Sequence, residues 1–199
     1  HEFGHALTAK RYGVATRDIT LFPIGGVARL ERIPEKPIQE IAVALAGPAV
    51  NMVIASVLMA VLSLGPPLDF RNPAILERSF LAKLLIINLF LAIFNLIPAF
   101  PMDGGRVLRA LLATRLSYVR ATQIAANVGQ GFALLFGLLG LFGNPVLLFI
   151  AFFVFIAAGQ EAAAVQMRSV FDGIPVSHAM VREFRTLNVD EPLSHAVQL

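Results

Sequence analysis

The chain has 199 residues, of which 57% are apolar and only 15% are charged, and its formal net charge is +3. Soluble domains average about 45–50% apolar and about 25% charged residues, so this composition excludes an ordinary soluble domain. The positive charges form no basic stripe with interleaved aromatic residues, which argues against nucleic-acid binding. Cysteine is absent, so any metal must be held by His, Asp or Glu.

The first predicted element is a helix that carries the pattern H-E-x-x-H at the start of the chain. Residues four apart lie on one face of a helix, so His1 and His5 can present their rings to one metal. Glu2 lies beside them, where it can activate a water molecule on that metal. The helical composition continues to Arg11 and Gly13 follows as a stop signal, so we expect the end of a helix whose start precedes this sequence.

The next predicted element is a short hairpin or a pair of bent strands within residues 18–31. Its β-branched residues, the Gly25–Gly26 pair and the alternation of apolar and polar residues near its end favour an extended chain. Pro34 and Pro37 are expected to end it. The glycine pair is compatible with a simple bend and also with a surface that contacts a bound peptide.

Three charge-free segments follow, at residues 41–68, 84–102 and 121–160. A membrane-spanning helix needs about 20 apolar residues, so the first two segments supply one helix each. The third is broken at the Gly-Asn-Pro of residues 143–145, which predicts a tight turn between two helices. We therefore predict four spanning helices, the first beginning after Glu40 and the others covering about residues 81–97, 122–142 and 145–163.

The segment between the second and third of these helices holds an unusual acidic residue. Residues 98–106 contain two prolines and a glycine pair, which should prevent a regular helix, and residues 106–120 are expected to form a basic, partly interfacial helix. Asp103 stands at the end of an otherwise uncharged stretch. An unpaired ionisable residue at membrane depth costs several kcal/mol, so Asp103 is a functional candidate by default.

Asp103 is also the best candidate for a third metal ligand. Catalytic zinc usually takes three protein ligands and one water, and His1 and His5 supply only two. His178 and His195 lie in a tail of ordinary soluble composition. The other acidic candidates belong to a loop beside the membrane: Glu31, Glu35 and Glu40. The alternative role for Asp103 is an ordinary Asp-Gly turn, because this dipeptide favours turns.

Loop charges predict the orientation in the membrane. The two membrane-proximal loops on the side of the H-E-x-x-H pattern carry ten basic residues: Lys10, Arg11, Arg17, Arg29, Arg32, Lys36, Arg106, Arg109, Arg115 and Arg120. The connections on the other side carry three: Arg71, Arg78 and Lys83. The positive-inside rule therefore places the start of the chain, Asp103 and the C-terminal tail on the cytoplasmic side.

Four segments together resemble the site-2 protease family of intramembrane zinc metalloproteases. They are HEFGH (residues 1–5), IGGVA (24–28), AGPAVN (46–51) and NLIPAFPMDGGR (95–106). They occur in the family's order, and the resemblance covers roughly residues 1–165. It implies one zinc ion per chain, held by His1, His5 and Asp103, with Glu2 as general base. It also implies that the Gly25–Gly26 segment forms a membrane-associated strand that helps to hold an extended substrate.

Two polar residues of the apolar segments have a possible role in the reaction. Asn51 and Asn95 could donate hydrogen bonds to the substrate backbone or to the oxyanion. Hydrogen bonds between helices, worth roughly 0.6 kcal/mol on average in membranes, are the alternative. A third polar set, Gln123, Asn127 and Gln130, lies on one helix face and is interpreted as helix packing.

The tail, residues 174–197, resembles the opening of a cystathionine-β-synthase (CBS) domain. Such domains come in pairs and often bind adenine nucleotides, so the resemblance implies a nucleotide site in the full-length protein. The expected division is a metalloprotease domain at residues 1–168, truncated at its N-terminus, followed at residues 169–199 by a linker and the start of a CBS domain.

The predicted fold class is an α-helical integral membrane protein, a multi-span bundle with a short membrane-associated β hairpin and a truncated N-terminal helix. The predicted function is zinc-dependent cleavage of the transmembrane segments of single-span substrate proteins at the cell membrane. One alternative is a soluble-type zinc peptidase with a membrane anchor, against which the charge-free segment before Asp103 argues. Another is a catalytically inactive membrane scaffold or transporter subunit.

Overall fold

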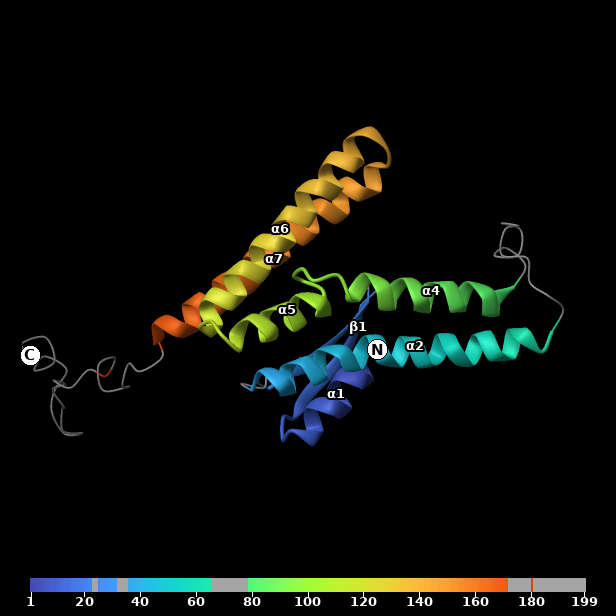
Figure 1. Ribbon diagram of the computed structural model, residues 1–199, viewed down its shortest axis with the longest axis horizontal. Coiled ribbons are helices and arrows are strands. Elements are labelled where there is room, and N and C mark those ends of the chain that lie inside the picture. The colour runs from blue at the N-terminus through green and yellow to red at the C-terminus, as the bar shows by residue number, and fades with distance from the viewer. Residues whose placement is uncertain (23–24, 32–35, 66–78, 172–179, 181–199) are drawn as a thin grey trace, which may run out of the picture. The chain divides into compact units, whose positions relative to one another are not determined.

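The computed structural model of the chain describes residues 1–22, 25–31, 36–65, 79–171 and 180. Over these residues the chain is mostly helical, with one two-stranded sheet (Figure 1). In chain order the elements are α1 (Glu2–Arg11), β1 (Thr16–Phe22), β2 (Gly25–Leu30), α2 (Pro37–Ser63), α4 (Phe80–Asn95), α5 (Asp103–Ala113), α6 (Tyr118–Phe142) and α7 (Pro145–Phe171). The predicted class, an α-helical membrane protein with a small hairpin, is confirmed.

The chain divides into two compact units, residues 1–166 and 167–199. The first unit contains both strands, all helices from α1 to α6 and most of α7. The segment that resembles a CBS domain, residues 174–197, lies outside the described residues except for Met180. The expected domain division therefore stays a prediction.

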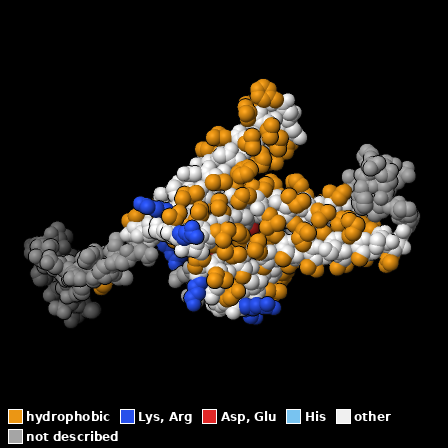
Figure 2. Space-filling view, viewed as in Figure 1, with side chains coloured by type: hydrophobic (Ala, Val, Ile, Leu, Met, Phe, Trp, Pro, Cys, Tyr) orange, Lys and Arg blue, Asp and Glu red, His pale blue; other side chains and the backbone are white. Residues whose placement is uncertain are grey.

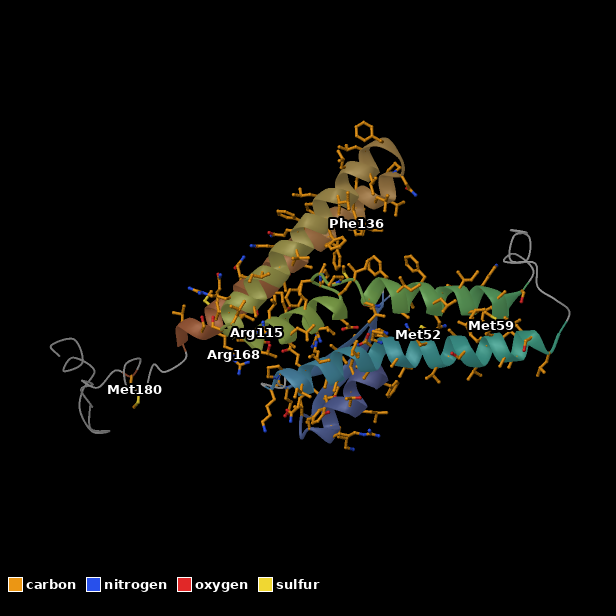
Figure 3. The ribbon with its side chains drawn as sticks, in the orientation of Figure 1. Met52, Met59, Arg115, Phe136, Arg168 and Met180 are labelled. Atoms are coloured by element: carbon orange, nitrogen blue, oxygen red, sulfur yellow. The ribbon has the colours of Figure 1, made fainter. Side chains whose placement is uncertain are left out.

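Three helices of the described part are long and apolar enough to cross a membrane: α2, α6 and α7. Helix α4, expected to span as well, has 16 described residues. At 1.5 Å per residue it is about 24 Å long, against a hydrocarbon core of about 30 Å. Met52 and Met59, which project from α2 (Figure 3), are each 44% exposed, as suits side chains that face lipid.

Apolar and basic side chains occupy different parts of the visible surface. In Figure 2, apolar side chains cover the exposed flanks of α2, α4, α6 and α7. The Lys and Arg side chains visible there gather where α1 lies and where α5 ends. This separation is expected of a protein whose charged end lies at a membrane surface.

Two helix starts differ from the prediction. Helix α2 begins at Pro37, four residues before the expected start, because proline is favoured at the first position of a helix. Helix α5 begins at Asp103, so the prediction that residues 98–106 are all non-helical is wrong for the last four of them. Asp103 stands in the first turn of α5, where the helix dipole favours a negative charge.

The expected helix at residues 106–120 is also wrong in its extent. Helix α5 ends at Ala113, and α6 begins at Tyr118 after a short break. The predicted turn at residues 143–145 is confirmed, since α6 ends at Phe142 and α7 begins at Pro145. Small side chains of α6 and α7 pack around Phe100 in a buried cluster that also contains Ala125, Ala126, Ala158 and Ala162.

The predicted hairpin is confirmed, with β1 and β2 antiparallel and Phe22 paired with Gly25. Its turn, residues 23–24, lies outside the described residues. Helix α1 packs against both strands and against α2. A side chain at Gly4 would overlap the α2 backbone at Ala46, so only glycine permits this close approach of α1 to α2. The packing fixes the helix that carries the two histidines.

Candidate active site

The ring nitrogens of His1 and His5 converge with a carboxylate oxygen of Asp103. The two Nε2 atoms lie 3.1 and 3.2 Å from Asp103 Oδ2, and the three potential ligand atoms lie within 4.8 Å of one another. Asp103 stands 102 positions beyond His1 in the sequence, on the first turn of α5. The structure thus brings together the three residues that the sequence singled out as potential ligands.

The orientation of His5 is set by the backbone of α2. Its Nδ1 lies 2.7 Å from the carbonyl oxygen of Val43, so Nδ1–H donates and Nε2 is the ring nitrogen that faces Asp103. A hydrogen bond of this kind to a carbonyl orients metal-binding histidines generally.

The electrostatics of the cluster favour a cation. Burial lowers the pKa of His5, but the hydrogen bond and the charge of Asp103 outweigh burial, so the pKa lies above its usual 6.5. The surroundings therefore stabilise positive charge between His5 and Asp103. Two histidines and one carboxylate are a donor set that suits Zn²⁺, so His1, His5 and Asp103 could hold it.

Gly47 of α2 lies directly behind the histidine rings. A side chain at this position would overlap Nε2 of His5 and of His1. The glycine therefore makes room for both rings, although glycine inside a helix costs about 1 kcal/mol relative to alanine. Asn51, four residues further along α2, was a predicted site residue and Gly47 was not, although a glycine in the middle of a helix was an available signal.

A cavity of about 240 Å³ opens beside the three residues. Besides the histidines and Asp103 it is lined by Glu2, Gly26, Ala28, Asn95, Pro101 and Arg106. The carboxylate of Glu2 accepts a hydrogen bond from the backbone N–H of Ala28, with Oε2 3.1 Å from the nitrogen. A carboxylate, a potential metal site and the edge of a strand therefore share one cavity.

The other predicted site residues fall in different places. Asn95 and Gly26 line the cavity, and the Asn95 amide also donates to the carbonyl of Leu91 at 2.9 Å. Asn51 is 3% exposed and does not line the cavity, and its Nδ2 has no hydrogen-bond partner among the described residues. Gly25 pairs with Phe22 at the start of β2.

A second ionic cluster lies outside the cavity and was not anticipated. Arg109 of α5 is fully buried and donates to Glu40 of α2 at 2.7 Å and to Glu161 of α7 at 2.9 Å. Its guanidinium also lies 5.0 Å from the ring centres of Phe100 and Tyr118. Burial lowers the pKa of Arg109, but the neighbouring negative charges outweigh burial and the net pKa is raised, so the guanidinium stays charged.

Comparisons with known proteins agree on a family. The model of peptidase family M50 matches residues 1–71 and 71–136. Zinc metalloprotease MJ0392 of Methanocaldococcus jannaschii is 42% identical over 183 residues, which cover 90% of this chain and 51% of that protein. Stage IV sporulation protein FB of Bacillus subtilis is 28% identical over 149 residues, which cover 73% of this chain and 48% of that protein.

A solved structure gives the same result. The site-2 protease from Methanocaldococcus jannaschii superposes with a TM-score of 0.65 at 38% sequence identity, covering 94% of this chain and 76% of that one. The chain spans about half the length of the two relatives named above. The fold, the site geometry and these matches lead to one conclusion: the chain belongs to peptidase family M50, the family of the site-2 proteases.

Proposed function

We propose that this chain is the catalytic part of a zinc-dependent intramembrane endopeptidase that cleaves transmembrane segments of single-span proteins. The observation that carries the proposal is the convergence of His1, His5 and Asp103 beside Glu2 in one cavity. Three apolar helices of spanning length in the same chain support a reaction within the bilayer.

One zinc ion per chain would be held by His1, His5 and Asp103. When bound, zinc supplies a Lewis acid that polarises the scissile carbonyl and acidifies the attacking water. Glu2 takes the proton from that water and then delivers it to the leaving amine. The hydrogen bond from Ala28 orients the Glu2 carboxylate for this transfer.

The substrate must lose its helical structure before cleavage, because a helix hides its carbonyl groups in its own hydrogen bonds. Strand addition to the open edge of β2 would hold the substrate extended, with Gly25 and Gly26 at the start of that edge. Asn95 is the amide available to the oxyanion, since it lines the cavity and its NH₂ group has a second hydrogen to donate. We prefer it to Asn51, which is buried outside the cavity.

We also propose that the cavity lies near the cytoplasmic face and that the C-terminal tail is cytoplasmic, on the basis of the loop charges. Arg109 is buried in the ionic cluster and no longer counts as a loop charge, which leaves nine basic residues against three. An adenine nucleotide is the proposed ligand of the CBS-like region in the full-length protein. Titration of that protein with an adenine nucleotide should change its cleavage rate, and absence of both binding and rate change would refute this part.

The decisive experiment compares the full-length protein with its Glu2→Gln variant. With a single-span substrate in vesicles, Glu2→Gln should abolish release of the substrate tail while zinc per chain stays near one. The exposed Glu31 offers a matched control, since Glu31→Gln should leave both quantities unchanged. Cleavage by Glu2→Gln would refute the assigned base. A full-length protein that binds no zinc and cleaves nothing would instead support an inactive scaffold.

A further inference from the structure

The N–H that binds Glu2 lies on the free edge of β2. Glu31 N–H donates to the carbonyl of Ala15 at 3.0 Å, so residue 31 faces the β1 side of the hairpin. In an antiparallel ladder, successive residues direct their N–H and C=O groups alternately toward and away from the partner strand. The N–H groups of Gly26 and Ala28 therefore point away from β1. Both residues line the cavity, as this alternation requires.

Two N–H groups of this free edge thus face the cavity, and they differ in their partners. Ala28 N–H is bound to Glu2 Oε2 at 3.1 Å, whereas Gly26 N–H has no partner among the described residues. Hydrogen bonds with an ionised partner are roughly twice as strong as neutral ones. A substrate carbonyl is neutral, so it would not displace the Glu2 carboxylate from Ala28.

We propose that the two N–H groups have separate tasks: the N–H of Ala28 positions the general base, and the N–H of Gly26 pairs with the extended substrate. This inference rests on the proposed function of Glu2. The bond to Oε2 fixes the carboxylate and leaves Oε1 free to accept the proton of the attacking water. A substrate carbonyl then pairs with the N–H of Gly26 and not with the N–H of Ala28, which sets the register of the bound peptide.

Proline substitutions separate the two tasks. Proline removes a backbone N–H and is tolerated where that N–H faces away from the sheet. In the full-length protein, Ala28→Pro should lower kcat roughly 10- to 100-fold, the usual effect of losing a hydrogen bond to a charged group. The KM for a single-span substrate should change less than about twofold, and zinc per chain should not change. Gly26→Pro should raise KM and leave kcat nearly intact.

Ile19 supplies the matched control, because it pairs directly with Ala28 and its N–H points away from β2 on the outer edge of the hairpin. Ile19→Pro should retain both kinetic constants. If Ala28→Pro fails to fold, an ester bond at this position, introduced with lactic acid in place of Ala28, removes the same N–H without a ring.

Three results would overturn the inference. The first is a raised KM with an intact kcat for Ala28→Pro or the ester. The second is a loss of kcat in Ile19→Pro equal to that in Ala28→Pro. The third is a loss of zinc together with kcat in Ala28→Pro. Each of these leaves the Glu2→Gln result untouched, so failure of this inference is distinguishable from failure of the proposed function.

Discussion

Two clusters of ionisable side chains lie within this apolar protein, and they are balanced differently. In the Glu40–Arg109–Glu161 cluster, each carboxylate faces a guanidinium N–H, at 2.7 and 2.9 Å. In the His1–His5–Asp103 cluster, two ring nitrogens and one carboxylate oxygen face one another. The first cluster already contains a permanent cation, and the second contains none, because a histidine is charged only when protonated.

The difference explains why only one cluster is a candidate for metal binding. An arginine has five donors and no acceptor, so it completes a set of carboxylates without any ion. Neutral histidines carry no charge, so a proton or a metal ion is needed to balance the charge of the Asp103 carboxylate beside them. The two clusters also differ in their exposure. The histidine cluster borders a cavity of about 240 Å³, whereas Arg109 is fully buried.

The largest effect is expected from Asp103→Ala. Removing this carboxylate from the His1–His5–Asp103 cluster should lower zinc per chain close to zero and proteolysis by more than about a thousandfold, since metal-ion catalysis supplies several kcal/mol. Metal analysis and the single-span cleavage assay on the full-length protein measure both. The control is Asp18→Ala, which removes an exposed carboxylate paired with Arg29 at 3.8 Å and should change neither. Normal zinc content in Asp103→Ala would place the metal elsewhere.

Arg109→Met tests the Glu40–Arg109–Glu161 cluster, which contains its own cation. It leaves two carboxylates without their cation, which should destabilise the fold by about 3–5 kcal/mol and lower the midpoint of thermal unfolding. Replacing the whole cluster, with Glu40→Leu and Glu161→Leu added, should restore most of that stability, because apolar side chains of similar volume often replace a buried ionic group well. A triple variant that unfolds as easily as Arg109→Met would show that this cluster does more than pack the helices.

The sequence was most informative where a pattern had one physical solution. Long uncharged segments can only be helices in a membrane, and α2, α6 and α7 follow that rule. The pattern H-E-x-x-H supplied two ligands and lacked a third, and Asp103 was the acidic residue at the end of an uncharged stretch. The structure places it against both histidines. Its role as a zinc ligand stays a prediction.

Contacts made by backbone groups and the partners of Arg109 could not be predicted. The Val43 carbonyl and the Ala28 N–H contact His5 and Glu2, but a backbone group leaves no mark on residue identity. Arg109 was counted as a loop charge because nothing in a single sequence shows which acidic residue it will meet. The start of α5 was missed because the glycine pair after Asp103 indicated a break, whereas in the fold it lets the helix approach the backbone of residues 96–100.

The smallest effect is expected from Gly47→Ala, which adds one methyl group behind the rings of His1 and His5. The methyl group would overlap Nε2 of both histidines, so the rings must turn away from Asp103. Zinc affinity should fall about 10- to 100-fold, as it does when groups that orient a ligand are lost. Gly131→Ala is the matched control, since a side chain there meets no atom within 4 Å. It should leave zinc affinity unchanged and slightly stabilise α6. Equal zinc affinity in the two variants would show that the histidine cluster has more room than the close approach of Gly47 implies. The difference in metal binding between the two clusters would then depend on their charges alone, and the tight packing of α2 against the histidine rings would contribute nothing to it.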